Sequence, residues 1–197
     1  MNQIIDSYVA IRLICTDVFQ SEVGIRNSHV PVVGGEDMVA DSDDDASAWG
    51  QTIREANERA DELRADGWDV VTVRAGHVAL LPPEAGDTDR FGLVYVAPDG
   101  VAESLPAAID RADLTQSAVF RQQVGTDRFL VTRVSDPDER VAVLLVGAVD
   151  LGRPEASDLA DAARSTGVLY SHVELLDGTH LATFEHDHPE DFLPVDG

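Results

Sequence analysis

The stretch VAVLLVGAV (residues 141–149) decides the fold, because it is apolar at nearly every position. A strand with one face in water alternates apolar and polar residues, whereas a strand covered on both faces is apolar throughout. We therefore expect a central strand over about 140–149, with packing layers on both sides. Two more strands, about 117–124 and 127–135, precede it with short links and predict an antiparallel meander.

Helical patterns lie on both sides of the meander in the sequence. Five apolar residues recur at spacings of four and three, which predicts an amphipathic helix that Gly67 ends: Trp49, Ile53, Ala56, Ala60 and Leu63. A second helix is expected over roughly 99–112, with Ser104 as its N-cap and Pro106 in its first turn. A third helix is expected from Pro154 to Gly167.

The remaining strand signals lie before the second helix and after the third. WDVVTV (68–73), HVALLPP (77–83) and FGLVYVA (91–97) are short and rich in β-branched or apolar residues. A C-terminal hairpin, 168–176 and 179–186, turns at Asp177–Gly178. Together these elements predict a single α+β domain over 46–194, mainly one antiparallel sheet, made of the meander plus the C-terminal hairpin, packed with about three helices.

The charge of the chain indicates where it works. It holds 37 acidic residues against 14 basic ones, for a formal net charge of -23, and every basic residue is arginine. Self-repulsion of this size destabilises a compact state unless salt screens it, and in molar salt the screening length is about 3 Å. The composition therefore predicts a halophilic, cytoplasmic protein. It argues against nucleic acid as a partner, because phosphate binding is driven by basic side chains.

The first 37 residues differ from the rest. They hold five of the seven isoleucines and few acidic residues, whereas Met38 opens an acidic stretch. We expect residues 1–37 to be an over-extended start or a disordered arm, and residues 38–45 to be an acidic linker. No apolar run reaches the roughly 20 residues of a membrane-spanning helix, and no secretory signal precedes the domain.

Four of the six histidines lie in YSHVELLDGTHLATFEHDH (170–188). A two-residue turn at 177–178 would place residues 172 and 183 opposite each other and leave one face of the hairpin apolar and one polar. His180 and His186 are then expected on the apolar face. His172 shares the polar face with Tyr170, Glu174 and Glu185, which makes these four residues the candidate catalytic set.

Metal binding has a partly different set of candidates, namely His172, His186 and His188. The HDH sequence places His186 and His188 on one strand face, whereas His172 points the other way. Since a zinc site needs three or four converging ligands, the histidines alone do not complete one. A polar, solvated sheet face with histidines at its edge is the simpler interpretation.

No motif assigns a cofactor. The chain lacks GxGxxG, GxxxxGK[ST], HExxH and GxSxG, and its single cysteine excludes an intrachain disulfide and a CxxC site. The favoured hypothesis is a non-catalytic protein-interaction or homodimerising domain. The alternatives are a metal-dependent, hydrolase-like enzyme on the polar face of the 168–186 hairpin, and a small-molecule sensor with a pocket between sheet and helices.

The favoured hypothesis depends on the meander. With turns at 125–126 and 136–139, one face carries Val119, Leu130, Thr132, Val134, Val141, Val143 and Leu145, and the other carries Phe120, Phe129, Val131, Leu144 and Val146. Three helices are not expected to cover both faces. An uncovered apolar face of this size would be an interaction surface, and a homodimer or a protein partner would bury it.

Four segments resemble an uncharacterised haloarchaeal protein family, a domain of unknown function, over roughly residues 45–194: GWDVVTV (67–73), GDTDRFGLVYVAP (86–98), VAVLLVGAVDL (141–151) and YSHVELLDGTHLATFEHDHPEDFLP (170–194). The resemblance implies a haloarchaeal source and a start near Met38. It implies no activity, cofactor or catalytic residue.

Overall fold

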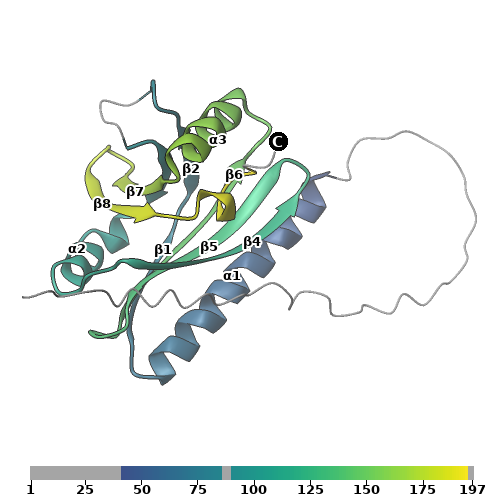
Figure 1. Cartoon of the computed structure of the whole chain (residues 1–197). Helices are drawn as coiled ribbons and strands as arrows, with labels where there is room; N and C mark the ends of the chain where they lie inside the picture. Colours follow the sequence, from purple (N-terminus) through teal and green to yellow (C-terminus); the bar gives the residue numbers. More distant parts are fainter. Residues whose placement is uncertain (1–40, 86–89, 195–197) are drawn as a thin grey trace, which may run out of the picture. The chain divides into compact units, whose positions relative to one another are not determined.

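The apolar stretch 141–149 forms strand β6 (Val141–Asp150) in the structure, a computed structural model that describes residues 41–85 and 90–194 (Figure 1). Residues 1–37, predicted to be an over-extended start or an arm, lie outside the described residues. Helix α1 begins at Asp41, so it includes the end of the segment 38–45 that was expected to be a linker.

The described residues contain three α-helices, eight strands and two short 3-10 turns. The helical elements are α1 (Asp41–Ala65), η1 (Asp99–Val101), α2 (Ser104–Ile109), α3 (Pro154–Thr166) and η2 (Pro189–Asp191). The other strands are β1 (Asp69–Arg74), β2 (His77–Leu81), β3 (Gly92–Ala97), β4 (Gln116–Val124), β5 (Asp127–Asp136), β7 (Leu169–Leu175) and β8 (His180–His186).

The strands form two four-stranded sheets, which corrects the expectation of one main antiparallel sheet. Sheet A has the order β1-β6-β5-β4, and sheet B has the order β2-β3-β7-β8. The meander and the C-terminal hairpin are confirmed, but β1 is parallel to β6 and β3 is parallel to β7, so both sheets are mixed. The fold class, α+β with three helices, is confirmed for the described part of the chain.

Sheet A has packing layers on both faces, as the apolar run of β6 predicts. One face packs against α1, where Ala56 and Ala60 allow the helix to approach Leu144 and Val146 closely. Arg59 of the helix lies over the ring of Phe120, 3.3 Å from its centroid, and so covers the edge strand β4. The described part of the chain therefore covers both apolar faces of the meander, and the prediction that three helices leave one of them uncovered is wrong.

The second face of sheet A packs against sheet B, and this layer is the main core. Leu145, Val143 and Leu130 of sheet A share a cluster with Leu93 and Val173 of sheet B. Helices α2 and α3 contribute to the same cluster from opposite ends of the sandwich, since α2 contacts β8 and β6 whereas α3 contacts β2 (Figure 1). Both helices thus close the ends of the sandwich.

The two sheets approach each other closely at Gly147. A side chain there would clash with Val78 of β2 and would press on the ring of Tyr95 in β3. The lack of a side chain at this position lets an aromatic ring of sheet B rest directly on the backbone of β6. This contact fixes the separation of the sheets at one point.

The helices differ from the sequence expectation mainly in length. The expected helix 99–112 is split into η1 and the short α2, which begins at Ser104 with Pro106 in its first turn. The N-cap is therefore Glu103 and not Ser104 as predicted, and it makes no side-chain capping bond. The ends of α1 and α3 are as predicted, with Gly67 and Gly167 at φ 83 and 74. None of the helices in the described ranges is long and apolar enough to cross a membrane.

Candidate functional site

The C-terminal hairpin carries the predicted site, and its register differs from the prediction at one end. Tyr170 pairs with Glu185 and His172 with Thr183, as predicted, but a bulge between Val173 and Glu174 brings His180 opposite Glu174. His180 was expected on the apolar face. The extra residue instead places it beside His172, with ring centroids 6.4 Å apart.

A directional hydrogen-bond chain links these two histidines. His172 Nε2 lies 2.8 Å from the Arg90 carbonyl, which can only accept, so this nitrogen donates. For a neutral His172, Nδ1 must then accept from the Thr183 hydroxyl at 2.9 Å. Since that hydroxyl has one proton, His180 Nε2 donates to it at 2.8 Å. The chain runs from an exposed imidazole to a buried one.

The environment of His172 favours its neutral form. Its side chain is only 6% exposed, and burial lowers the pKa of His172, while its hydrogen bond to Arg90 works in the opposite direction. Because both ring nitrogens have partners, neither offers a lone pair to a metal ion without rearrangement. The chemistry available here is proton relay between His172 and His180.

The other predicted catalytic residues lie around this pair. The Tyr170 hydroxyl donates to Glu185 at 3.0 Å, and the Arg90 guanidinium lies 6.0 Å from the Tyr170 ring. Partial burial, followed by the bond to Glu185, raises the pKa of Tyr170. Glu174 is half-buried on the same face. The structure therefore brings Tyr170, His172, Glu174 and Glu185 to one face, while their catalytic role stays a prediction.

The three candidate metal ligands are separated. His186 is 1% exposed between the sheets, on the face opposite His172. His188 lies past β8 in an exposed position, where its Nδ1 is 3.2 Å from Glu190. Within residues 41–85 and 90–194, no group of three or more His, Cys, Asp or Glu side chains is arranged to hold a metal ion. A metal site would need ligands from elsewhere.

His186 belongs to a polar cluster inside the sandwich. Its Nε2 lies 2.9 Å from the Ser171 hydroxyl, its ring packs 4.5 Å from that of Phe192, and its Nδ1 is buried without a partner among the described residues. Burial lowers the pKa of His186 to about 4. This serine–histidine pair has no acidic partner in contact and no exposure to a substrate, so it is a structural pair.

Two more buried hydroxyls adjoin this cluster. Burial raises the pKa of Tyr95 to about 12, and the hydroxyls of Thr132 and Ser171 lie near enough to work in the opposite direction. Their geometry makes no hydrogen bond, so the hydroxyls of Tyr95 and Thr132 are both unpaired within the described part of the chain. A sheet interior normally pairs such groups, which makes this the least satisfied part of the core.

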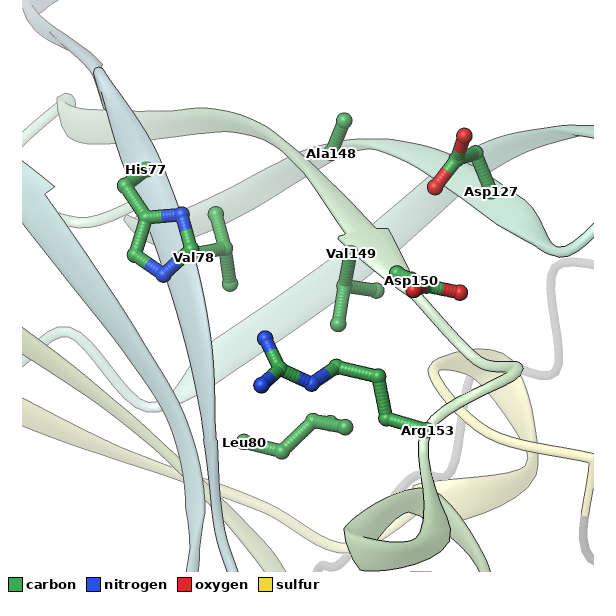
Figure 2. Close-up of a pocket in the computed structure, with 8 residues that line it drawn as sticks. All are labelled: His77, Val78, Leu80, Asp127, Ala148, Val149, Asp150 and Arg153. Atoms are coloured by element: carbon green, nitrogen blue, oxygen red, sulfur yellow. The ribbon is translucent and has the colours of Figure 1, made fainter.

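The sequence does not predict a second region, a cavity of about 190 Å³ beside the edge strand β2 (Figure 2). Its polar residues come from three separate segments: His77, Asp127, Asp150 and Arg153. No spacing in the sequence groups them, because only the packing of sheet B against sheet A brings β2 next to the end of β6. Only their charge differs from the surrounding apolar pattern.

The outer face of sheet B remains uncovered by any described helix or strand. We use this name for the residues that share it by strand alternation: His77, Ala79, Leu81, Gly92, Val94, Val96, Tyr170, His172, Glu174, His180, Thr183 and Glu185. Most are half-buried, which is typical of side chains that cover one another on an open sheet.

Comparison with known proteins gives a family but no activity. No curated protein and no solved structure matches the chain. A family of unknown function, DUF7529, matches residues 35–194, which is most of the chain and includes both sheets. On this match the chain belongs to the DUF7529 family, a family of unknown function.

Proposed function

We propose that this chain is a non-catalytic, homodimerising module of a halophilic cytoplasm, and that the outer face of sheet B is the surface through which two copies meet. The proposal rests on which faces of the two sheets are packed against another layer. Both faces of sheet A and the inner face of sheet B are packed, whereas the outer face of sheet B has no described layer over it.

Charge favours a second copy at this face. A chain with net charge -23 repels itself, so two copies associate best where acidic side chains are few. The outer face holds two carboxylates, Glu174 and Glu185, and the Arg90 guanidinium lies beside Tyr170 at its edge. The acidic, lysine-free composition supports the halophilic and haloarchaeal part of the proposal, since molar salt would screen the remaining repulsion.

The side chains of the face are suited to an interface core. Val94 and Val96 lie on the inner strand β3, where Val94 is flanked by Ala79 and His172, and Leu81 and Tyr170 lie on either side of Gly92 on the same strand. Aliphatic and tyrosine side chains are common at the centre of an interface. The hydrogen bonds of His172 are already satisfied within one copy, so burying this residue further leaves no unpaired group.

Sedimentation equilibrium of the full chain in molar KCl tests the proposal. We expect a dimer for the unmodified chain and a monomer for Val94→Asp, because a buried carboxylate at the centre of an interface is strongly unfavourable. Leu81→Ser, at the edge of the face, is a milder variant that weakens the dimer while keeping the fold. Ala107→Asp, on the exposed side of α2, adds the same charge elsewhere and is the matched control.

Two results would contradict the proposal. One is an unmodified chain that stays monomeric at every accessible concentration in molar KCl. The other is a dimer that Val94→Asp and Leu81→Ser leave intact while both variants keep the far-ultraviolet circular dichroism of the parent. Either result would mean that the outer face of sheet B is an ordinary solvated surface and not a dimer interface.

A further inference from the structure

The cavity beside β2 is a second candidate site, which shares the edge residue His77 with the proposed dimer face. It lies between His77, Val78 and Leu80 of β2 and the segment Ala148–Asp150 of β6, and Arg153 closes one side. Its volume of about 190 Å³ is below the range of about 300 Å³ and above that suits drug-sized ligands. It therefore fits a molecule with the size of a single amino acid.

The charges that line this cavity are segregated. Figure 2 shows the Arg153 guanidinium extending toward the ring of His77, while Asp127 and Asp150 lie on the opposite side. The Asp150 carboxylate is held in place, because its Oδ1 accepts the backbone N–H of Gly152 at 2.8 Å. Arg153 is anchored only loosely, since its Nε is 3.8 Å from Glu155 Oε2.

The tight turn after β6 sets this arrangement. A side chain at Gly152 would crowd Thr126 and the Asp150 carboxylate, so the glycine allows the chain to turn immediately after the strand. Arg153 follows directly and is the N-cap residue of α3, with an extended backbone. Its side chain is thus directed back along the strand end and across the cavity (Figure 2).

The floor between the two charged sides is apolar. Val78 and Val149 are 4% and 1% exposed, and in Figure 2 Val149 lies between the carboxylates and the guanidinium, whereas Val78 lies beside the His77 ring. Leu80 and Ala148 extend the same surface. A ligand that fills this space must carry an aliphatic group between its polar ends, or beside them.

From this geometry we propose that the cavity binds a small zwitterion with an aliphatic body, such as a free aliphatic amino acid. Its ammonium group pairs with Asp127 and Asp150, its carboxylate pairs with Arg153, and its aliphatic part lies on Val78 and Val149. A simple anion would meet two carboxylates in an already acidic chain, and a simple cation would meet the guanidinium. A zwitterion satisfies both sides at once.

Titration of the ¹⁵N-labelled chain in molar KCl, followed by amide chemical shifts, tests this proposal. The probes are L-leucine, 4-methylpentanoate, which lacks the ammonium group, and 3-methylbutylamine, which lacks the carboxylate. We expect L-leucine to shift the amides of Val78 and Val149 in a saturable manner. Each half-ligand should bind at least about tenfold more weakly, since it loses one charge-assisted contact.

Two matched pairs of variants locate the site. Arg153→Gln and Asp150→Asn should each weaken leucine binding at least about tenfold. Arg54→Gln and Asp138→Asn remove the same charges at exposed positions away from the cavity and should leave binding unchanged. No shift with leucine up to its solubility limit would overturn the proposal. Equally tight binding of 3-methylbutylamine would overturn it in favour of a plain cation site.

Discussion

Sheets A and B each have four strands and one parallel pair, yet they differ in the number of faces that are covered. Strand β6 of sheet A is buried at eight of its ten positions, whereas β8 of sheet B alternates between buried and accessible side chains. The difference shows a division of labour. Sheet A is packed on both faces, while sheet B is packed on one face and has no described layer over the other.

The largest expected effect tests this division directly with two Leu→Ala variants. Leu144 is fully buried between sheet A and α1, so Leu144→Ala should lower the free energy of unfolding by about 3 kcal/mol. Leu81 is half-buried on the outer face of sheet B, and Leu81→Ala should cost less than about 1 kcal/mol. Urea unfolding at constant molar KCl measures both, and equal losses would remove the distinction between the sheets.

The second prediction concerns pH and the inner face of sheet B. The pKa of His186 is about 4 in the folded chain and about 6.5 when unfolded, so the unfolded state binds more protons between these values. The stability that comes from the neutral, buried His186 is fully present above pH 6.5, and it is lost as the pH falls toward 4. The loss should reach about 3 kcal/mol for His186, and the lowered pKa of His172 adds to it.

His186→Gln sharpens the pH prediction, because it removes the titrating group while keeping a polar side chain near Ser171. We expect a shallower dependence of unfolding free energy on pH between 6.5 and 4. His188→Gln, at an exposed position past β8, serves as the control. A full slope in the His186→Gln variant would assign the effect to other groups.

A third prediction compares the turn aspartates of the two sheets. Asp136 at the end of β5 accepts backbone N–H groups from Asp113, Asp138 and Glu139, and these bonds lower the pKa of Asp136. Asp177 in the β7–β8 turn accepts the backbone N–H of Thr179 at an exposed position, and its bonds to the Thr179 backbone and side chain lower the pKa of Asp177. Asp136→Asn should therefore destabilise the chain more than Asp177→Asn at pH 7, measured by thermal unfolding.

The lowered pKa of Asp136 also predicts how the effect of Asp136→Asn on stability depends on pH. A carboxylate whose pKa is lowered by folding stabilises the fold above its unfolded pKa, and this stabilisation is lost as the pH falls through the folded pKa. The gap between Asp136→Asn and the unmodified chain should consequently narrow in strong acid. A gap that does not depend on pH would indicate that the amide makes the turn fail for steric reasons instead.

The smallest effect is expected where a buried hydroxyl has no partner. Thr132→Val removes an unpaired hydroxyl and fills the same space, so it should leave stability unchanged or raise it slightly. Ser171→Ala breaks the bond to His186 and should cost about 1 kcal/mol. If Thr132→Val is clearly destabilising, the Thr132 hydroxyl has a partner, such as a buried water between the sheets.

The sequence predicts local pairing in this chain much better than distant pairing. The meander and the C-terminal hairpin follow from apolar alternation and from the Asp177–Gly178 turn, and both are confirmed. The parallel pairs β1–β6 and β3–β7 join segments that lie far apart in the chain. Hydrophobic periodicity does not say which distant strand is the neighbour, so two sheets were taken for one.

The sequence predicts the candidate site only in part, because local strand alternation is visible in the residues whereas a bulge and contacts with distant segments are not. The shared face of Tyr170, His172, Glu174 and Glu185 follows from strand alternation, but the bulge that moves His180 beside His172 has no signal in the residues around it. The partner of His172 in the segment before β3, the Arg90 carbonyl, is a backbone atom and carries no sequence signature. The cavity beside β2 depends on a contact between the sheets.

The parallel pairs also determine when this protein can finish folding during synthesis. Asp69 finds its neighbour only when Val141 has left the ribosome, and Gly92 waits for Tyr170. Until then β1 lacks its strand neighbour and α1 lacks the part of its docking surface that β6 supplies, and such long-range closure is slow. A nascent chain that stalls before β6 therefore leaves the edges of β1 unpaired, which favours aggregation, and sheet A is completed before sheet B.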